Sequence, residues 1–299
     1  MNEAAALLGA TLRLATPLLF GALAGLFSER SGVIDVGLEG KMLIAAFAAG
    51  SVAAVTGSPV EGLLAAILAA CALGLVHAYA CVDLRGNQVV SGMAVNIIAS
   101  GLTATLALML FQQGGQTPAL PETARFRPVW LGLSPLTLAA LALVPLSSVV
   151  LARTRFGLRL RAAGEHPAAL DTAGISVSRL RYAGVLIASV LCGVAGASVA
   201  IAEGAGFQRD MIAGRGYIAL AAMILGHWRP WLVLLSCLGF GALDAAAIRL
   251  QGIALPVVGV VPDAAVQALP FVLTIVLLAG FVGRATPPPA SGLPYVKER

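Results

Sequence analysis

The sequence predicts an all-α fold, a polytopic membrane helix bundle of about nine transmembrane helices. Two observations favour this fold class. Of the 299 residues, 59% are hydrophobic and 11% are charged, and the mean hydropathy is +0.93. A soluble domain does not need so apolar a composition, because about half of its residues are normally polar or charged. The apolar residues also fall into repeated runs close to the roughly 20 that span a bilayer as a helix.

Nine apolar runs are candidates for spans. They are Ala4–Phe27, Leu38–Val55, Val60–Val82, Val89–Phe111, Val129–Leu151, Tyr182–Ile201, Met211–Gly226, Trp231–Leu250 and Ala264–Val282. Met211–Gly226 is short, so we expect either a half-helix or a tilted span there. Since no polar stretch is long enough for a soluble domain, residues 1–299 are expected to form a single transmembrane domain.

The basic residues predict the orientation of the bundle. If nine spans cross the membrane, one set of alternate loops holds most of them: Arg30, Lys41, Arg85, Arg153, Arg155, Arg159, Arg161, Arg179, Arg181, Arg229, Arg284, Lys297 and Arg299. Short cytoplasmic loops are enriched in Lys and Arg. We therefore expect the N-terminus outside and the C-terminus inside. This distribution explains the net charge of +5, and no nucleic-acid partner is expected.

Three stretches interrupt or follow the runs. In "SERSGVIDVGLEGK", Asp35 and Glu39 lie among glycines, which predicts either an irregular loop packed against the bundle or a solvated loop. Residues 283–299 predict an extended cytoplasmic tail, since three consecutive prolines occur there. Residues 152–181 form a long cytoplasmic loop whose basic ends, Arg153 to Arg161 and then Arg179 with Arg181, are expected to anchor at the lipid headgroups.

The centre of that loop, "GEHPAALDTAGIS", has the signals of a short helix. Pro167 suits a first helical position, Glu165 precedes it near the positive helix end, and Gly174 can end it. A two-turn helix from Pro167 to about Ala173 would expose Ala168 and a second alanine. Such a helix suits docking in a groove. The alternative is a simple connection, which needs far fewer residues.

The sequence offers no catalytic or metal site. A phosphate-binding loop for ATP is absent, because "GLEGK" lacks both the spacing and the following Ser or Thr. The histidines and cysteines lie far apart without metal-ligand spacing: His77, His166, His227, Cys71, Cys81, Cys192 and Cys237. We therefore do not expect an enzyme, a metal or a cofactor on this chain.

Four motifs carry a family resemblance. "RAAGEHPAALDTAGISVSRLR" resembles the cytoplasmic coupling loop of ABC-importer permeases, in the branch that serves simple sugars, branched amino acids and nucleosides. "SERSGVIDVGLEGKMLIAAFAA", "NQVVSGMAVNIIASGLT" and "LPYVKER" resemble signatures of the nucleoside-type permeases in that branch. The resemblance extends over nearly the whole chain.

This resemblance implies a permease subunit of the bacterial inner (plasma) membrane. Expected partners are a second homologous permease, a separate ATPase that binds ATP and Mg²⁺, and an extracytoplasmic substrate-binding protein. The coupling role would belong to the residues that match the motif: Gly164, Glu165, Pro167, Ala168, Asp171 and Gly174.

The expected substrate is a neutral polar solute, and the resemblance favours nucleosides among such solutes. Gln88, Ser91 and Asn96 are candidates for the translocation path; the alternative is that these side chains form hydrogen bonds between helices. A simple sugar is the alternative substrate. An ion-coupled secondary carrier is less favoured, because ionisable residues are sparse in the spans.

Overall fold

The computed structural model describes residues 3–113, 115–130, 132–250, 254–255, 259–260, 272 and 286–296. Its helices are α1 (Glu3–Arg30), α2 (Leu38–Thr56), α3 (Pro59–Ala78), α4 (Gln88–Phe111), α5 (Pro135–Arg153), α6 (Arg155–Glu165), α7 (Pro167–Thr172), α8 (Val177–Ala197), α9 (Arg215–Leu225) and α10 (Pro230–Leu250). The π-helices η1 (Tyr79–Asp83) and η3 (Ser198–Glu203) extend α3 and α8, and η2 (Glu122–Ala124) is a 3-10 turn. Two-residue strands, β1 (Ala254–Leu255) and β2 (Gly259–Val260), pair antiparallel.

Seven helices within the described residues are long and apolar enough to cross a membrane: α1, α2, α3 with η1, α4, α5, α8 with η3, and α10. They confirm seven of the expected runs and the helical fold class. The seventh run contains α9, whose 11 residues rise only about 16 Å, about half of the roughly 30 Å hydrocarbon thickness. The ninth expected run, Ala264–Val282, lies outside the described residues.

The fifth run begins later than the sequence suggested. The prediction of a helix from Val129 was wrong, because α5 begins at Pro135. The hydroxyl of Ser134 accepts a hydrogen bond from the Thr137 amide at 3.2 Å, and proline suits the first helical position because it has no amide hydrogen to satisfy there. Before Ser134, Trp130 and Leu133 instead pair in an isolated antiparallel bridge.

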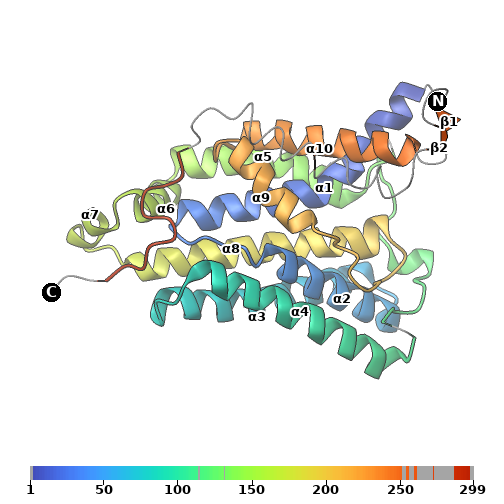
Figure 1. The fold of residues 1–299 in the computed structure, drawn as a ribbon, viewed down its shortest axis with the longest axis horizontal. Coiled ribbons are helices and arrows are strands. Elements are labelled where there is room, and N and C mark those ends of the chain that lie inside the picture. Colours follow the sequence, from blue (N-terminus) through green and yellow to red (C-terminus); the bar gives the residue numbers. More distant parts are fainter. Residues whose placement is uncertain are drawn as a thin grey trace.

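The helices α1, α2 and α8 form the centre of the bundle, and α3, α4, α5 and α10 lie around them (Figure 1). Close approach at small residues joins the central helices. A Cβ atom built on Gly196 of α8 would lie 2.2 Å from the carbonyl oxygen of Met42 in α2. Such close approach is the usual basis of helix association in lipid, where the hydrophobic effect does not drive helices together.

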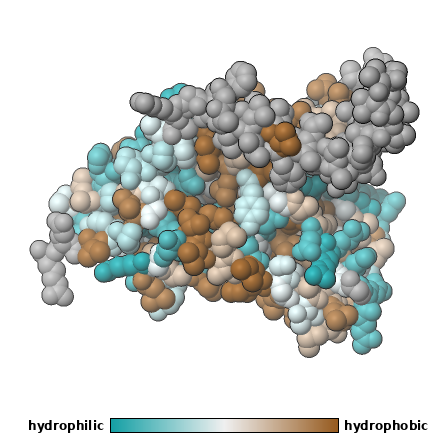
Figure 2. All heavy atoms as spheres, viewed as in Figure 1, coloured by the Kyte–Doolittle hydropathy of each residue, from teal (hydrophilic) through white to brown (hydrophobic). Residues whose placement is uncertain are grey.

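The outer helices present apolar side chains to the surroundings. Leu68 of α3, Ile97 and Met109 of α4, and Leu235 of α10 are each at least 64% exposed. Figure 2 shows apolar residues over the middle of one face and hydrophilic residues more often towards the ends of the long axis. Water does not favour so large an apolar surface. The protein is therefore a multi-pass membrane protein.

The two ends of the bundle differ in which loops and short helices they carry. The first described turn of α1 lies at one end of the long axis, whereas α6, α7 and residues 286–296 lie at the other (Figure 1). The basic loops meet at the α7 end, where Arg85 shares a cavity lining with Asp171 and Arg229 shares another with Glu165. At the opposite end, the loop after α4 joins the loop after η3 through a hydrogen bond from the Thr117 amide to the Phe207 carbonyl.

Candidate functional site

The α7 end carries the short helix that the sequence predicts. Pro167 is the first residue of α7 and Thr172 is the last, one residue before the predicted end. Gly174 then adopts a φ of +76°, which side chains other than glycine rarely tolerate. The flanking helices are capped: Thr154 accepts the Gly157 amide before α6, and Ser176 accepts the Arg179 amide before α8. The loop is therefore a folded unit.

One face of α7 packs inward and the other is open. Leu170 is buried with Ala163 of α6 and with Val177 and Leu180 of α8. The outward residues of α7 and its C-cap are small: Ala168, Ala169, Thr172 and Ala173 are exposed. This arrangement confirms the predicted exposure of the alanines. A partner surface could approach the α7 backbone closely along this face.

The charged residues of the predicted coupling motif contact the rest of the chain. Glu165 lies 3.4 Å from the Arg30 guanidinium and 3.9 Å from that of Arg161. Asp171 accepts a hydrogen bond at 3.0 Å from the Tyr295 hydroxyl. These carboxylates therefore hold α7 in place, and the exposed face of α7 consists of alanine and threonine side chains.

Gly164 and Arg181 are both buried in this loop. A Cβ atom on Gly164 would lie 2.6 Å from the Arg30 carbonyl oxygen, so α6 ends in close contact with the end of α1. Arg181 is only 2% exposed and donates a hydrogen bond at 2.9 Å to the Leu293 carbonyl. The prediction that Arg181 anchors at lipid headgroups was therefore wrong. Arg153, Arg155, Arg159 and Arg179 are exposed, and their anchoring at the headgroups stays a prediction.

The α1–α2 loop, residues 31–37, is largely buried and descends along α4. The Ile34 amide donates to the side chain of Gln88, the first residue of α4, and the Gly40 amide donates to Asn96, eight positions further along. Those eight positions correspond to about 12 Å along the helix. Irregular backbone inside a membrane helix bundle is tolerated where protein surrounds it. The packed alternative for this loop is confirmed, and the solvated alternative was wrong.

A buried charge cluster anchors this loop. The Lys41 ammonium lies 2.5 Å from a carboxylate oxygen of Asp35, and both side chains are fully buried. His77 of α3 lies 3.7 Å from the other oxygen of Asp35. Burial opposes ionisation of Asp35, but Lys41 and His77 hold its pKa below its usual value. Sequence reasoning counted Lys41 as a loop charge and missed this cluster, because 36 residues separate His77 from Lys41.

The three candidates for the translocation path surround the same loop. Gln88 and Asn96 bind it as described, and the Asn96 amide also donates to the Val36 carbonyl at 3.1 Å and to the Tyr217 hydroxyl at 2.9 Å. The Ser91 hydroxyl lies 3.0 Å from Nδ1 of His77. All three therefore take part in packing between helices, which the sequence left open beside a path role.

Glu39, in the first turn of α2, contacts the N-terminal end of α9. Its two carboxylate oxygens accept hydrogen bonds from the Gly214 and Gly216 amides at 2.8 and 2.7 Å. A carboxylate at a helix N-terminus satisfies free amides and interacts favourably with the helix dipole.

Within the described residues, no three His, Cys, Asp or Glu side chains are grouped as metal ligands would be.

Comparison with known proteins decides the family. The family model described as the permease component of branched-chain amino acid transport systems matches residues 7–279. The chain belongs to this permease family. The match covers nearly all of the described bundle, including the α1–α2 loop and α7.

Curated relatives of the permease are similar over most of their length. It is 38% identical to the guanosine ABC transporter permease NupQ of Bacillus subtilis, over 96% of this chain and 95% of that protein. It is also 38% identical to the nucleoside ABC transporter permease NupC of Lactococcus lactis, over 95% and 94%. The permease TsgC13 of Haloferax volcanii, which is named for glucose transport, is 36% identical over 85% and 80%.

A solved structure supports the same fold. It is described as a metal-chelate type ABC transporter in an inward-facing conformation, and it matches the permease with a TM-score of 0.56. The match covers 91% of this chain and 84% of that one at 15% identity. At this identity the likeness concerns the helical fold alone.

Proposed function

We propose that this permease is a subunit of an ATP-driven importer for nucleosides. The observation that carries the proposal is the 38% identity, over almost the whole of both chains, to permeases named for guanosine and nucleoside transport. Nucleosides are neutral and polar, and a path for them needs hydrogen-bonding groups without a fixed charge. A simple sugar is the second candidate, because TsgC13 is also similar over most of its length.

The proposed complex contains this permease, a second homologous permease, a separate ATPase that binds ATP and Mg²⁺, and an extracytoplasmic substrate-binding protein. The exposed alanine face of α7 would dock on the ATPase, with Gly164, Glu165, Pro167, Ala168, Asp171 and Gly174 shaping that end of the loop. Closure of the ATPase would then move α7, and the spans would rock between outward and inward openings.

Uptake by the reconstituted complex tests the substrate. Labelled guanosine or another nucleoside is expected to enter liposomes only when ATP and the binding protein are both present, and excess glucose should not compete. Competition by glucose with no competition by nucleosides would contradict the nucleoside assignment and favour the sugar. Uptake driven by a proton or sodium gradient without ATP would contradict the importer itself.

Asn96 is the candidate path residue with the most specific surroundings. It lies beside Tyr217, whose side chain is 40% exposed and could contact a flat base. Gln88 and Ser91 lie nearer the α7 end of α4. In the uptake assay, Asn96→Asp should change the order in which nucleosides compete, whereas a role in packing alone would change only the amount of protein.

The proposed orientation places the N-terminus outside and α7 with the C-terminus in the cytoplasm of a bacterium, in a bundle of nine spans. It is supported by the basic loops that gather at the α7 end. A cysteine replacing exposed Ala168, in a Cys71→Ala background, is expected to react with a membrane-impermeant maleimide in inside-out vesicles. Equal labelling in intact cells would contradict this orientation. Cys81, Cys192 and Cys237 are buried and provide the unreactive background.

A further inference from the structure

Residues 286–296, called the strap below, cross the α7 end of the bundle and contain turns but neither helix nor strand (Figure 1). Within the part of the chain that the structure describes, hydrogen bonds join the strap to four segments distant in sequence. The Ala290 amide donates to the Gly164 carbonyl at 2.9 Å, and the Gly292 amide donates to the Gly32 carbonyl at 3.3 Å. Arg181 donates to the Leu293 carbonyl, and the Tyr295 hydroxyl donates to Asp171. The strap thereby touches the α1–α2 loop, α6, α7 and α8.

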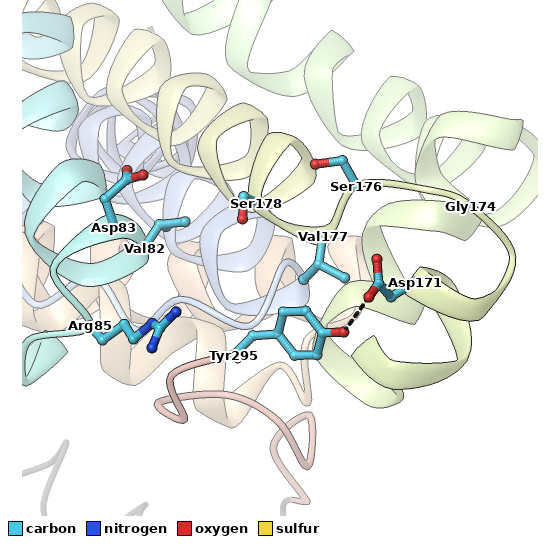
Figure 3. Close-up of a pocket in the computed structure, with 9 residues that line it drawn as sticks. All are labelled: Val82, Asp83, Arg85, Asp171, Gly174, Ser176, Val177, Ser178 and Tyr295. Carbon is cyan, nitrogen blue, oxygen red and sulfur yellow. Dashed lines mark hydrogen bonds between the residues drawn. The ribbon is translucent and has the colours of Figure 1, made fainter. Parts of the chain in front are cut away.

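Tyr295 contacts α7 with both its ring and its hydroxyl. The ring packs against the apolar cluster of Ala163, Leu170, Val177 and Leu180. Figure 3 shows the ring near Val177 with its hydroxyl directed at Asp171, along a cavity of about 320 Å³ that Asp83 and Arg85 also line. An isolated helix of six residues is unstable, so α7 depends on such contacts for its position.

The middle of the strap is fitted to the α1–α2 loop. Gly292 adopts a φ of +80°, and a Cβ atom there would lie 2.9 Å from the side chain of Ile34. The loop on its other side is fixed to α2, α3 and α4 by the Asp35–Lys41 pair, His77, Gln88 and Asn96. A continuous set of contacts therefore runs from α7 through the strap to the loop inside the bundle.

We propose that the strap positions α7 against the α1–α2 loop, with Tyr295 as a positioning residue, so that motion of α7 reaches the spans. This inference rests on the proposed function, because it assigns the strap a part in the coupling of ATP hydrolysis to import. A tail that is only a passive end of the chain would make no difference to that coupling.

Hydrogen exchange on the purified permease tests the positioning without any partner. Tyr295→Ala removes the ring and hydroxyl, and amides of residues 166–176 should then exchange about tenfold faster, since a lost bond to a charged group corresponds to about that factor. Leu293→Ala is the matched control: Leu293 is 59% exposed, and its hydrogen bonds to Arg181 and Ala290 use its carbonyl and amide, which alanine also has. Unchanged exchange in Tyr295→Ala would overturn the proposal.

Solute imported per ATP hydrolysed tests the role in coupling. In the full reconstituted complex this ratio should fall about threefold in Tyr295→Phe, which loses one hydrogen bond, and further in Tyr295→Ala. Asp171→Ala combined with Tyr295→Phe should lose no more than Asp171→Ala alone, because Asp171→Ala already removes the acceptor of the Tyr295 hydroxyl. If Tyr295→Ala imports as much solute per ATP as the wild type, the coupling role is overturned. The same holds if this variant only lowers the amount of assembled complex and leaves that ratio unchanged.

The two proposals fail in different ways. If the wild-type complex imports no solute with ATP, the proposed function is contradicted. The hydrogen-exchange experiment then still tests, without any partner, whether the strap positions α7. The second outcome is a wild-type complex that imports nucleosides, with strap variants that all have the wild-type ratio of solute to ATP and the wild-type rate of hydrogen exchange. This outcome contradicts the role of the strap and leaves the proposed function standing.

Discussion

Lys41→Met is expected to destabilise the permease by about 3–5 kcal/mol, because removing one partner of a buried ion pair leaves an uncompensated charge. In the wild type, Lys41 lies 2.5 Å from Asp35, and neither side chain is exposed. Methionine keeps most of the volume of the lysine stem but supplies no charge. Thermal unfolding in detergent, followed by size-exclusion chromatography, should show a lower midpoint and less monodisperse protein.

Two control variants isolate the cause. Asp35→Asn with Lys41→Met removes both charges and should recover much of the lost stability. Arg155→Met makes a similar change of charge at an exposed site of α6 and should unfold close to the wild-type midpoint. If Lys41→Met unfolds at the wild-type temperature, the buried pair does not hold the loop.

Replacing the two alanines of α7, Ala168→Arg with Ala169→Arg, is expected to abolish nucleoside uptake while leaving the permease folded. Both side chains are exposed on the open face of α7, so arginines fit the isolated permease. On that face they would prevent the close approach of a docking partner. Uptake by the reconstituted complex and retention of the ATPase on affinity-tagged permease measure the effect together.

The matched control for the docking face is Ala152→Arg. Ala152 is also an exposed alanine, in the last turn of α5 and next to Arg153, but it lies outside α7. This variant should retain the ATPase and import nucleosides at the wild-type rate. Full uptake by the α7 double variant would show that the ATPase docks elsewhere.

The sequence predicts those parts of the molecule that depend on local signals. Apolar runs locate the long helices because lipid requires about 20 apolar residues in each span. Pro167 and Gly174 locate α7 because proline favours a helix start and glycine tolerates a left-handed end. The start of α5 was missed because Val129 and Trp130 are apolar but lie before the Ser134 cap.

Contacts between distant residues cannot be read in the same way. In the sequence, Asp35 and Lys41 resemble ordinary loop charges. Only the folded structure shows that α3 and α4 surround them, with His77 near Asp35 and Gln88 bound to the same loop. Arg181 belongs to a basic segment, and only the position of Leu293 shows that it faces inward. For the same reason the sequence predicted an extended tail but could not predict its contacts with α7.

Among the described residues, three of the hydrogen bonds from residues 286–296 to distant segments involve main-chain atoms of 286–296: the amides of Ala290 and Gly292 and the carbonyl of Leu293. Every residue type other than proline supplies these groups. Apart from Gly292 and Tyr295, whose identities matter as described above, evolution can therefore exchange side chains there at little cost, whereas inserting or deleting a single residue would put each donor opposite the wrong acceptor. Selection in this part of the chain should act on spacing more strongly than on residue identity.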